Sequence, residues 1–221
     1  MSGLSYVERR AEGDPEGLLV LHHGRGSNEH DLIGLADIFD PRRRLHVVSP
    51  AGPLELPGMP GRHWYVVPRV GFPDPDTFHA AYAALSGFHD ELWAATGIGP
   101  GQTVLGGFSM GAVMSYATGL GEGRPIPAGI LALSGFVPTV NGWAPALAER
   151  KGMPVLIAHG RQDPVIPVGF ARQARELLEG GELDVTYEES DAAHHVDPGQ
   201  VPSIVNWLDS ALPGPPGQPP G

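Results

Sequence analysis

The chain alternates between short runs of consecutive apolar residues and longer stretches in which apolar residues recur at helical spacing. Short apolar runs predict buried strands, and apolar residues at helical spacing predict amphipathic helices. Strands are expected over residues 18–22, 45–49, 102–108, 128–134, 155–159 and 183–188, with an edge strand within 4–10. Helices are expected over 28–39, 110–120, 168–179 and 202–212, in part of 143–150, and from a cap at Asp76 or Thr77 to about residue 96. The alternation predicts an α/β fold with a mostly parallel central sheet and helices on both faces.

The segments that lack this periodicity suggest where the domain ends. A length of 221 residues suits one domain, which we expect over residues 1–212. Residues 213–221 are Pro, Gly and a single Gln, so they bury little apolar surface and are expected to form a disordered tail. The two long loops, 51–75 and 136–152, are still short compared with a large lid, so no such lid over a binding site is expected.

Composition excludes several classes of partner and chemistry. The formal net charge is −11 and the pI about 5.2, which disfavours binding to nucleic acid or to anionic lipid surfaces. The chain has no Cys, which removes disulfides, thiolate nucleophiles and Cys-based zinc sites. An apolar segment that could serve as a secretory signal or a membrane span is missing from the sequence, so we expect a cytoplasmic protein without stable membrane insertion.

One pentapeptide, from Gly107 to Gly111, matches the pattern G-x-S-x-G of a nucleophile elbow. It follows a predicted strand and opens a predicted helix, which is the context that this motif requires. The turn would raise the hydroxyl of Ser109 at the carboxyl end of the sheet, next to a helix N-terminus that favours negative charge. An exposed N-cap serine in a Gly-rich turn is the alternative. We expect Ser109 to be a nucleophile.

A serine nucleophile needs a base, and the base needs a carboxylate that orients it. In folds that carry a nucleophile elbow, the acid and then the histidine follow the serine along the chain, on loops after later strands. Asp163 comes shortly after strand 155–159 and is the expected acid. Two histidines, His194 and His195, follow strand 183–188 side by side, and the residues alone do not choose between them.

The oxyanion hole is expected to consist of the backbone N–H groups of Met110 and Arg25. Arg25 lies between two glycines in the turn after the first buried strand. No Lys follows in the G-x-x-x-x-G-K pattern, so this turn is not predicted to bind phosphate as a P-loop does. No H-E-x-x-H helix accompanies the histidines, so no metal and no other cofactor is expected.

Five segments together resemble the phospholipase/carboxylesterase family, the small α/β-hydrolases that include bacterial carboxylesterases and acyl-protein thioesterases. They are residues 21–32, 61–65, 106–111, 159–167 and 194–196, and the resemblance extends from residue 21 to about 207. It implies the α/β-hydrolase fold. The family has Gly-His-x-[Ile/Val] before its last helix, which implies that His194 is the base. Ala193 stands where the family usually has Gly.

Aromatic residues in the two long loops are candidates for the acyl-binding surface. The resemblance places Trp64 in the family's aromatic loop as one wall of a pocket, with a core-packing role as the alternative. Phe72, Phe136, Val137 and Trp143 could complete an apolar groove.

Together with these residues, the resemblance implies a serine carboxylesterase that hydrolyses short- to medium-chain acyl esters through an acyl-enzyme intermediate. A lysophospholipase or an acyl thioesterase with the same triad is the alternative, and a non-catalytic binding protein of the same fold is a further one. A small-molecule acyl ester is the expected partner, and the family resemblance implies a monomer or a homodimer.

Overall fold

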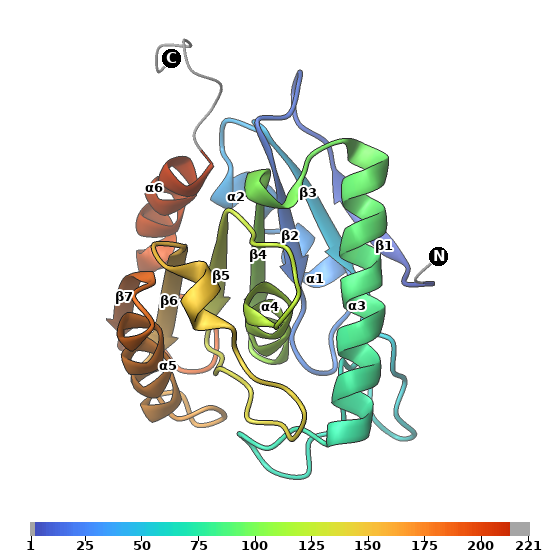
Figure 1. Cartoon of the computed structure of the whole chain (residues 1–221), viewed down its shortest axis with the longest axis vertical. Coiled ribbons are helices and arrows are strands. Elements are labelled where there is room, and N and C mark those ends of the chain that lie inside the picture. The colour runs from blue at the N-terminus through green and yellow to red at the C-terminus, as the bar shows by residue number, and fades with distance from the viewer. Residues whose placement is uncertain (1–2, 213–221) are drawn as a thin grey trace.

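The computed structural model describes residues 3–212 and contains a seven-stranded sheet in the order β1-β3-β2-β4-β5-β6-β7 (Figure 1). The strands are β1 (Tyr6–Arg9), β2 (Gly17–His22), β3 (Leu45–Pro50), β4 (Thr103–Phe108), β5 (Gly129–Leu133), β6 (Pro154–Gly160) and β7 (Asp184–Ser190). Strand β1 pairs antiparallel with β3, and every other pair is parallel. The mostly parallel α/β fold is therefore confirmed. The expected tail over 213–221 lies outside the described residues.

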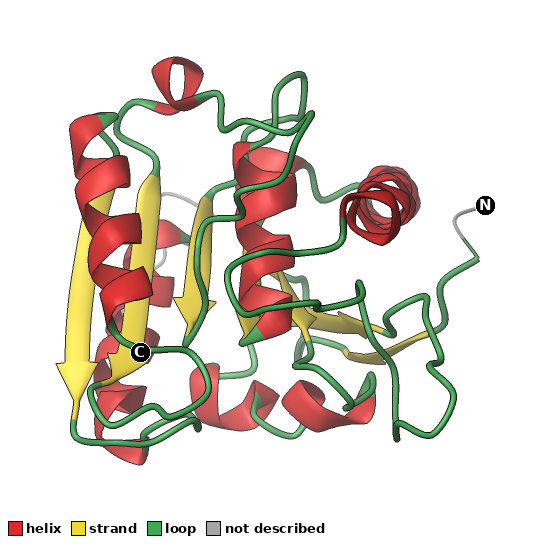
Figure 2. Cartoon of the chain, turned by 90° about the horizontal axis from the view of Figure 1, so that it is seen from below, coloured by secondary structure: helices red, strands yellow, loops and turns green. Residues whose placement is uncertain are grey.

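Helices cover both faces of the sheet (Figure 2). They are α1 (His30–Ile33), α2 (Ala36–Phe39), α3 (Pro75–Thr96), α4 (Met110–Leu120), α5 (Gly169–Gly180) and α6 (Val201–Ala211), with 3₁₀ turns η1 (Pro100–Gln102), η2 (Leu147–Arg150) and η3 (Pro198–Gln200). Side chains of α3, α4 and α5 share buried clusters with one face of the sheet, and those of α1, α2 and α6 share a cluster with the other. Strands β2, β4 and β5 are buried along almost their whole length, as continuous apolar runs predict.

The parallel register brings the carboxyl ends of neighbouring strands to one edge of the sheet. His22 at the end of β2 lies opposite Gly107 of β4, and Gly160 at the end of β6 lies opposite Ser190 of β7. The loops that follow these strands therefore meet at the same edge, where ligands bind in open α/β sheets.

Two predicted helices differ from the structure. The helix expected over 28–39 is two single-turn helices, α1 and α2, with Gly34 as the C-cap of the first. Glycine costs about 1 kcal/mol in a helix interior, which favours a break at this point. The N-cap of helix α3 is Asp74 rather than Asp76 or Thr77, because the Asp74 side chain accepts a hydrogen bond from the Thr77 N–H and Pro75 takes the first helical position.

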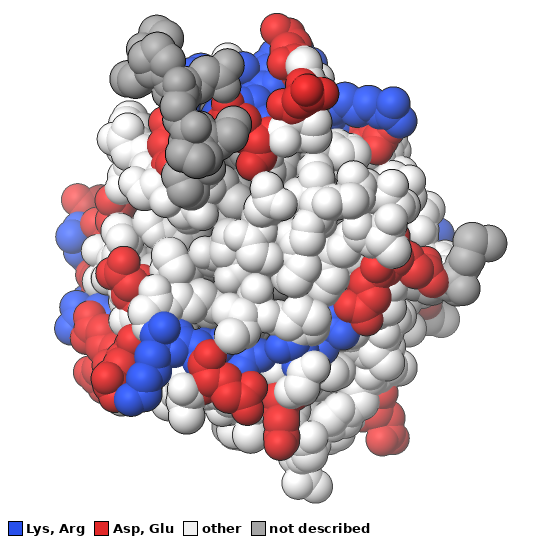
Figure 3. Space-filling view, turned by 45° about the horizontal axis from the view of Figure 1, so that its top comes forward, with Lys and Arg blue, Asp and Glu red and all other residues white. Residues whose placement is uncertain are grey.

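Charged side chains of opposite sign lie beside one another on the face shown in Figure 3. Within residues 3–212, no helix combines the length and the apolar character needed to cross a lipid bilayer.

Candidate active site

The turn between β4 and α4 holds Ser109 in a strained backbone conformation. Ser109 is the N-cap of α4 with φ 57° and ψ −120°, a region that non-glycine residues rarely occupy. A Cβ on Gly111 would lie 1.9 Å from the carbonyl oxygen of His22, and one on Gly107 would lie 2.5 Å from the backbone of Gly111. The two glycines of the G-x-S-x-G pattern are therefore required by the close approach of β2, β4 and α4.

A chain of hydrogen bonds joins the three residues that the sequence singles out. His194 Nε2 lies 2.9 Å from Ser109 Oγ, and His194 Nδ1 lies 2.6 Å from Asp163 Oδ2. Because an imidazole with its proton on Nδ1 donates to the carboxylate, its Nε2 is left to accept the proton of the serine hydroxyl. The residues come from the ends of β4, β6 and β7, which the register brings to one edge.

The carboxylate of Asp163 is held on both of its oxygens. Its Oδ1 accepts hydrogen bonds from the N–H groups of Val165 and Ile166, at 2.8 and 2.9 Å. Burial alone would raise the pKa of Asp163, but the hydrogen bonds from His194 and from these two N–H groups outweigh it and lower the pKa overall. Asp163 therefore stays ionised and fixes the orientation of the imidazole.

A second histidine supports the turn that carries Asp163. The ring of His159, at the end of β6, is buried, and its Nε2 donates to the carbonyl oxygen of Ile166 at 2.8 Å. Burial lowers the pKa of His159 below its ordinary value. A neutral His159 therefore ties the start of this turn to its end.

The loop that carries His194 packs directly onto the end of β6. A Cβ on Gly160 would lie 2.2 Å from the carbonyl oxygen of Ala192 and 2.5 Å from that of Ala193. The ring of Phe108, next to the serine, lies against the His194 ring with 4.9 Å between centroids. The neighbouring His195 is exposed. Of the two candidate histidines, only His194 lies between Ser109 and Asp163.

Two residues expected to supply the oxyanion hole, Met110 and Arg25, line the same cavity as Ser109. Met110 is the first residue of α4, where the N–H groups of the first turn have no partner within the helix. Arg25 lines the same cavity as Ser109, and its N–H donates to no acceptor within residues 3–212. The backbone N–H groups of both residues are therefore free to donate to a ligand in this cavity.

Ser109 and His194 open onto a cavity of about 280 Å³. Its other lining residues are Gly24, Arg25, Ser27, Asp31, Tyr65, Val67, Arg69, Val70, Pro73, Phe108, Met110, Phe136, Val165 and Ile166. Most of these side chains are apolar, and three are charged. Sequence reasoning missed Val67, Val70, Val165 and Ile166, although the last two lie inside a segment that carries the family resemblance.

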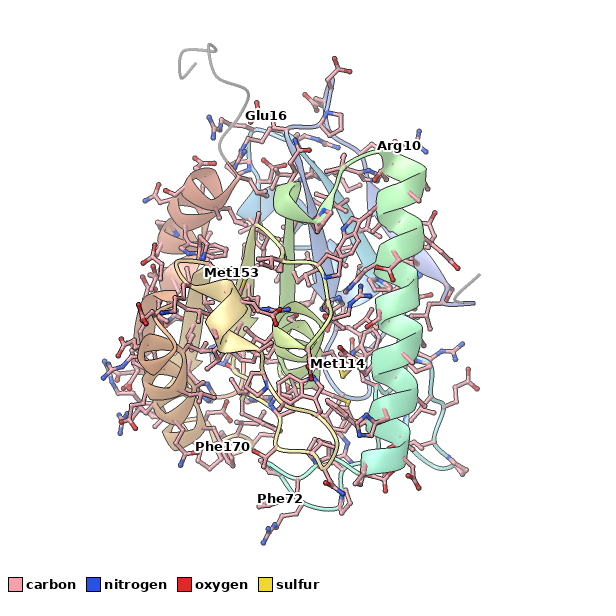
Figure 4. All side chains as sticks on the ribbon, in the orientation of Figure 1. Arg10, Glu16, Phe72, Met114, Met153 and Phe170 are labelled. Atoms are coloured by element: carbon pink, nitrogen blue, oxygen red, sulfur yellow. The ribbon has the colours of Figure 1, made fainter. Side chains whose placement is uncertain are left out.

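Of the four aromatic residues expected at the substrate site, only Phe136 lines the cavity. Trp64 is fully buried and donates its indole N–H to the carbonyl oxygen of His23, so it belongs to the core. The side chain of Phe72 is 48% exposed and lies at the lower end of the molecule (Figure 4), against the Arg69 guanidinium. Trp143 packs on α4 and donates to the carbonyl oxygen of Ala117.

A further histidine pair is buried beside the elbow and does not line the cavity. His22 Nδ1 lies 2.8 Å from Ser115 Oγ of α4, and His22 Nε2 lies 3.1 Å from His89 Nε2 of α3. Burial lowers the pKa of both histidines, that of His89 to about 3. The neutral pair therefore joins β2 to both helices. Over residues 3–212, no group of three or more His, Asp or Glu side chains is arranged to hold a metal ion.

Comparison with known proteins agrees with this architecture. A sequence profile described as Phospholipase/Carboxylesterase matches residues 7–212. Acyl-protein thioesterase 1 of Gibberella zeae is 26% identical over 215 residues, covering 88% of this chain and 90% of that protein. Acyl-protein thioesterase 1 of Emericella nidulans is 31% identical over 53% of this chain and 51% of that protein. A Bacillus cereus carboxylesterase structure has a TM-score of 0.78 at 26% identity, covering 95% of each chain. The chain therefore belongs to the phospholipase/carboxylesterase family of hydrolases, which its sequence segments resemble.

Proposed function

We propose that the chain is a serine carboxylesterase that hydrolyses short- to medium-chain acyl esters through an acyl-enzyme intermediate. The observation that carries the proposal is the continuous hydrogen-bond chain from Ser109 through His194 to Asp163, at 2.9 and 2.6 Å. Such a chain converts a weakly nucleophilic hydroxyl into one that loses its proton as it attacks.

In the proposed reaction Ser109 Oγ attacks the ester carbonyl while His194 Nε2 takes the hydroxyl proton. The tetrahedral oxyanion is stabilised by the N–H groups of Met110 and Arg25. His194 then gives the proton to the departing alcohol. A water molecule, deprotonated by His194, attacks the acyl carbonyl, and His194 returns this proton to Ser109 Oγ as the acid leaves. Asp163 stabilises the imidazolium through both transfers without being protonated itself.

The size and lining of the cavity support the proposed acyl length. A volume of about 280 Å³ is at the low end of small-molecule sites, which span roughly 300–1,000 Å³. Its apolar wall includes Val70, Phe136 and Ile166. A short acyl chain would therefore leave water against this wall, and one of medium length would fill it.

An acyl thioesterase is the second candidate, because two relatives are named acyl-protein thioesterase 1. The same triad could attack a thioester, whose leaving group is a thiolate. Matched oxygen and sulfur esters of butyrate and octanoate, compared by kcat/KM, separate the two functions.

The test of the nucleophile uses a fluorophosphonate probe and p-nitrophenyl butyrate. Ser109→Ala should lose labelling and at least about 10³-fold in kcat, whereas Ser210→Ala, on the surface helix α6, should keep both. Asp163→Asn should fold normally and lose about 10⁴-fold in kcat, because the amide orients the imidazole in the wrong tautomer. Turnover or labelling that survives Ser109→Ala would disprove the assignment, and an unlabelled wild type would favour a binding protein.

A further inference from the structure

Arg25 and Arg69 differ from every other Lys and Arg of the protein, because neither makes an ion pair with a residue of the described range 3–212. All 14 Lys and Arg residues lie within the described residues 3–212. Each of the others has a carboxylate oxygen within 4 Å, the longest of these contacts being 3.6 Å for Arg175 and Glu179. In a chain of net charge −11, two basic side chains without a carboxylate partner are unexpected.

Both unpaired arginines line the cavity that contains Ser109. The other Lys and Arg side chains have carboxylate partners, and on the face shown in Figure 3 basic and acidic side chains lie next to one another. The positive charge that remains available to a ligand is thus concentrated at one place, where the substrate of the serine would bind.

The guanidinium of Arg69 is held in place, while its N–H groups donate to no acceptor among residues 3–212. It lies 3.7 Å from the centroid of the Phe72 ring. A tight turn supports this contact. In the turn, the Phe72 N–H donates to the Arg69 carbonyl oxygen, and Gly71 has φ 85°. Stacking uses the face of the guanidinium and leaves the N–H donors in its plane available to a planar anion.

Arg25 also keeps its side-chain donors. Within the described part of the chain, the only acceptor of its guanidinium is Met59 Sδ at 3.8 Å, and a thioether is a weak acceptor. The side chain is exposed in the turn whose backbone N–H is the expected oxyanion donor. A group bound by this guanidinium would therefore lie close to the reacting ester.

One carboxylate, that of Asp31, also lines the cavity. It makes no ion pair with Arg25 or Arg69. The two arginines and this one carboxylate together give the cavity lining a formal charge of +1, the triad not being counted. We propose that Arg25 and Arg69 form a subsite for an anionic group of the ester substrate, a carboxylate or a phosphate ester. This inference rests on the proposed esterase function and narrows its substrate class to esters that carry a negative charge near the scissile bond.

The test compares matched esters that differ in charge. Monoethyl adipate against diethyl adipate gives the carboxylate comparison, and 1-butyrylglycerol 3-phosphate against 1-butyrylglycerol gives the phosphate comparison. For the wild type we expect a higher kcat/KM for the anionic member of at least one pair, through a lower KM, with the advantage shrinking at 0.5 M NaCl as screening increases. The pair that shows it identifies the anion.

Variants assign the preference to the two arginines. Arg25→Gln and Arg69→Gln should each lower the ratio of anionic to neutral kcat/KM by about threefold, and the double variant by about tenfold, as expected for exposed charge contacts. Phe72→Leu should lower the ratio as well, since it removes the support of Arg69. The matched control is Arg10→Gln, an exposed arginine paired with Glu8, which should leave the ratio unchanged.

A direct binding measurement tests the anionic subsite independently of catalysis. Ser109→Ala should bind adipate or glycerol 3-phosphate in calorimetry, and the same protein with Arg25→Gln and Arg69→Gln should bind that ligand more weakly. Absence of turnover on every ester, with binding retained, would refute the esterase and keep the subsite. Neutral esters preferred in both pairs, or ratios and binding unaffected by the arginine variants, would overturn the subsite alone.

Discussion

The buried ring of His89 makes the stability of this fold depend on pH. Its pKa falls from the ordinary 6.5 to about 3, because burial opposes the charged form and the nearby Arg124 adds to the effect. In the unfolded chain the ring is solvated and binds a proton near its ordinary pKa. Between these two values the unfolded state binds more protons, so the free energy of unfolding decreases as the pH falls.

The expected size of this effect follows from the two pKa values. From pH 7 to pH 5, His89 alone should remove about 2 kcal/mol from the free energy of unfolding. The substitution His89→Gln removes the titrating group and keeps an amide that can hydrogen-bond to His22. The stability of the His89→Gln variant at pH 7 does not decide the test, because the measured quantity is the change in the free energy of unfolding between pH 7 and pH 5.

Urea unfolding followed by far-UV circular dichroism at pH 7 and pH 5 measures this change. The wild type should lose about 2 kcal/mol more than His89→Gln over this interval. His30→Gln makes the same change at an exposed position and should behave as the wild type does. Equal losses in the wild type and His89→Gln would show that the buried ring is not kept neutral, and the reasoning would be wrong.

Two further predictions concern the elbow and the cavity wall. Gly111→Ala places a methyl group 1.9 Å from the His22 carbonyl oxygen and should destabilise the fold by about 3 kcal/mol or more, whereas Gly101→Ala, with no atom within 4 Å, should not. Equal melting temperatures for the two variants would contradict the elbow geometry. Phe136→Ala removes part of the cavity wall and should shift the preferred p-nitrophenyl ester to a longer acyl chain. Trp64→Phe should lower the melting temperature without changing that preference, and the reverse pattern would place Trp64 in the cavity.

Local sequence could predict the elbow because each of its parts has a local cause. An apolar strand, a serine between two glycines and a helix from Met110 to Leu120 follow one another without a gap, and the helix limits match the prediction. The positions of Asp163 and His194 also follow from a general rule, since the carboxyl ends of parallel strands lie at one edge. The register of β6 with β7 supplies that arrangement here.

The aromatic residues could not be assigned in the same way, because their positions depend on how long loops fold back. Trp64 is a large aromatic residue of the kind that often forms a pocket wall. Its loop nevertheless directs the side chain into the core, where the His23 carbonyl oxygen accepts a hydrogen bond from the indole N–H. Phe72 lies on the outside because a tight turn at Gly71 directs it to Arg69. Periodicity and motif spacing carry no signal for either contact.

The packing of the His194 loop onto Gly160 has a consequence for genetic variation. Position 160 lies outside the cavity lining, so a search for damaging variants that considers only the lining residues would miss it. Any side chain there would meet the backbone of Ala192 and Ala193, and the loop would have to move away from the serine. We therefore expect a random mutagenesis screen for inactive but folded protein to recover replacements of Gly160 together with those of the triad.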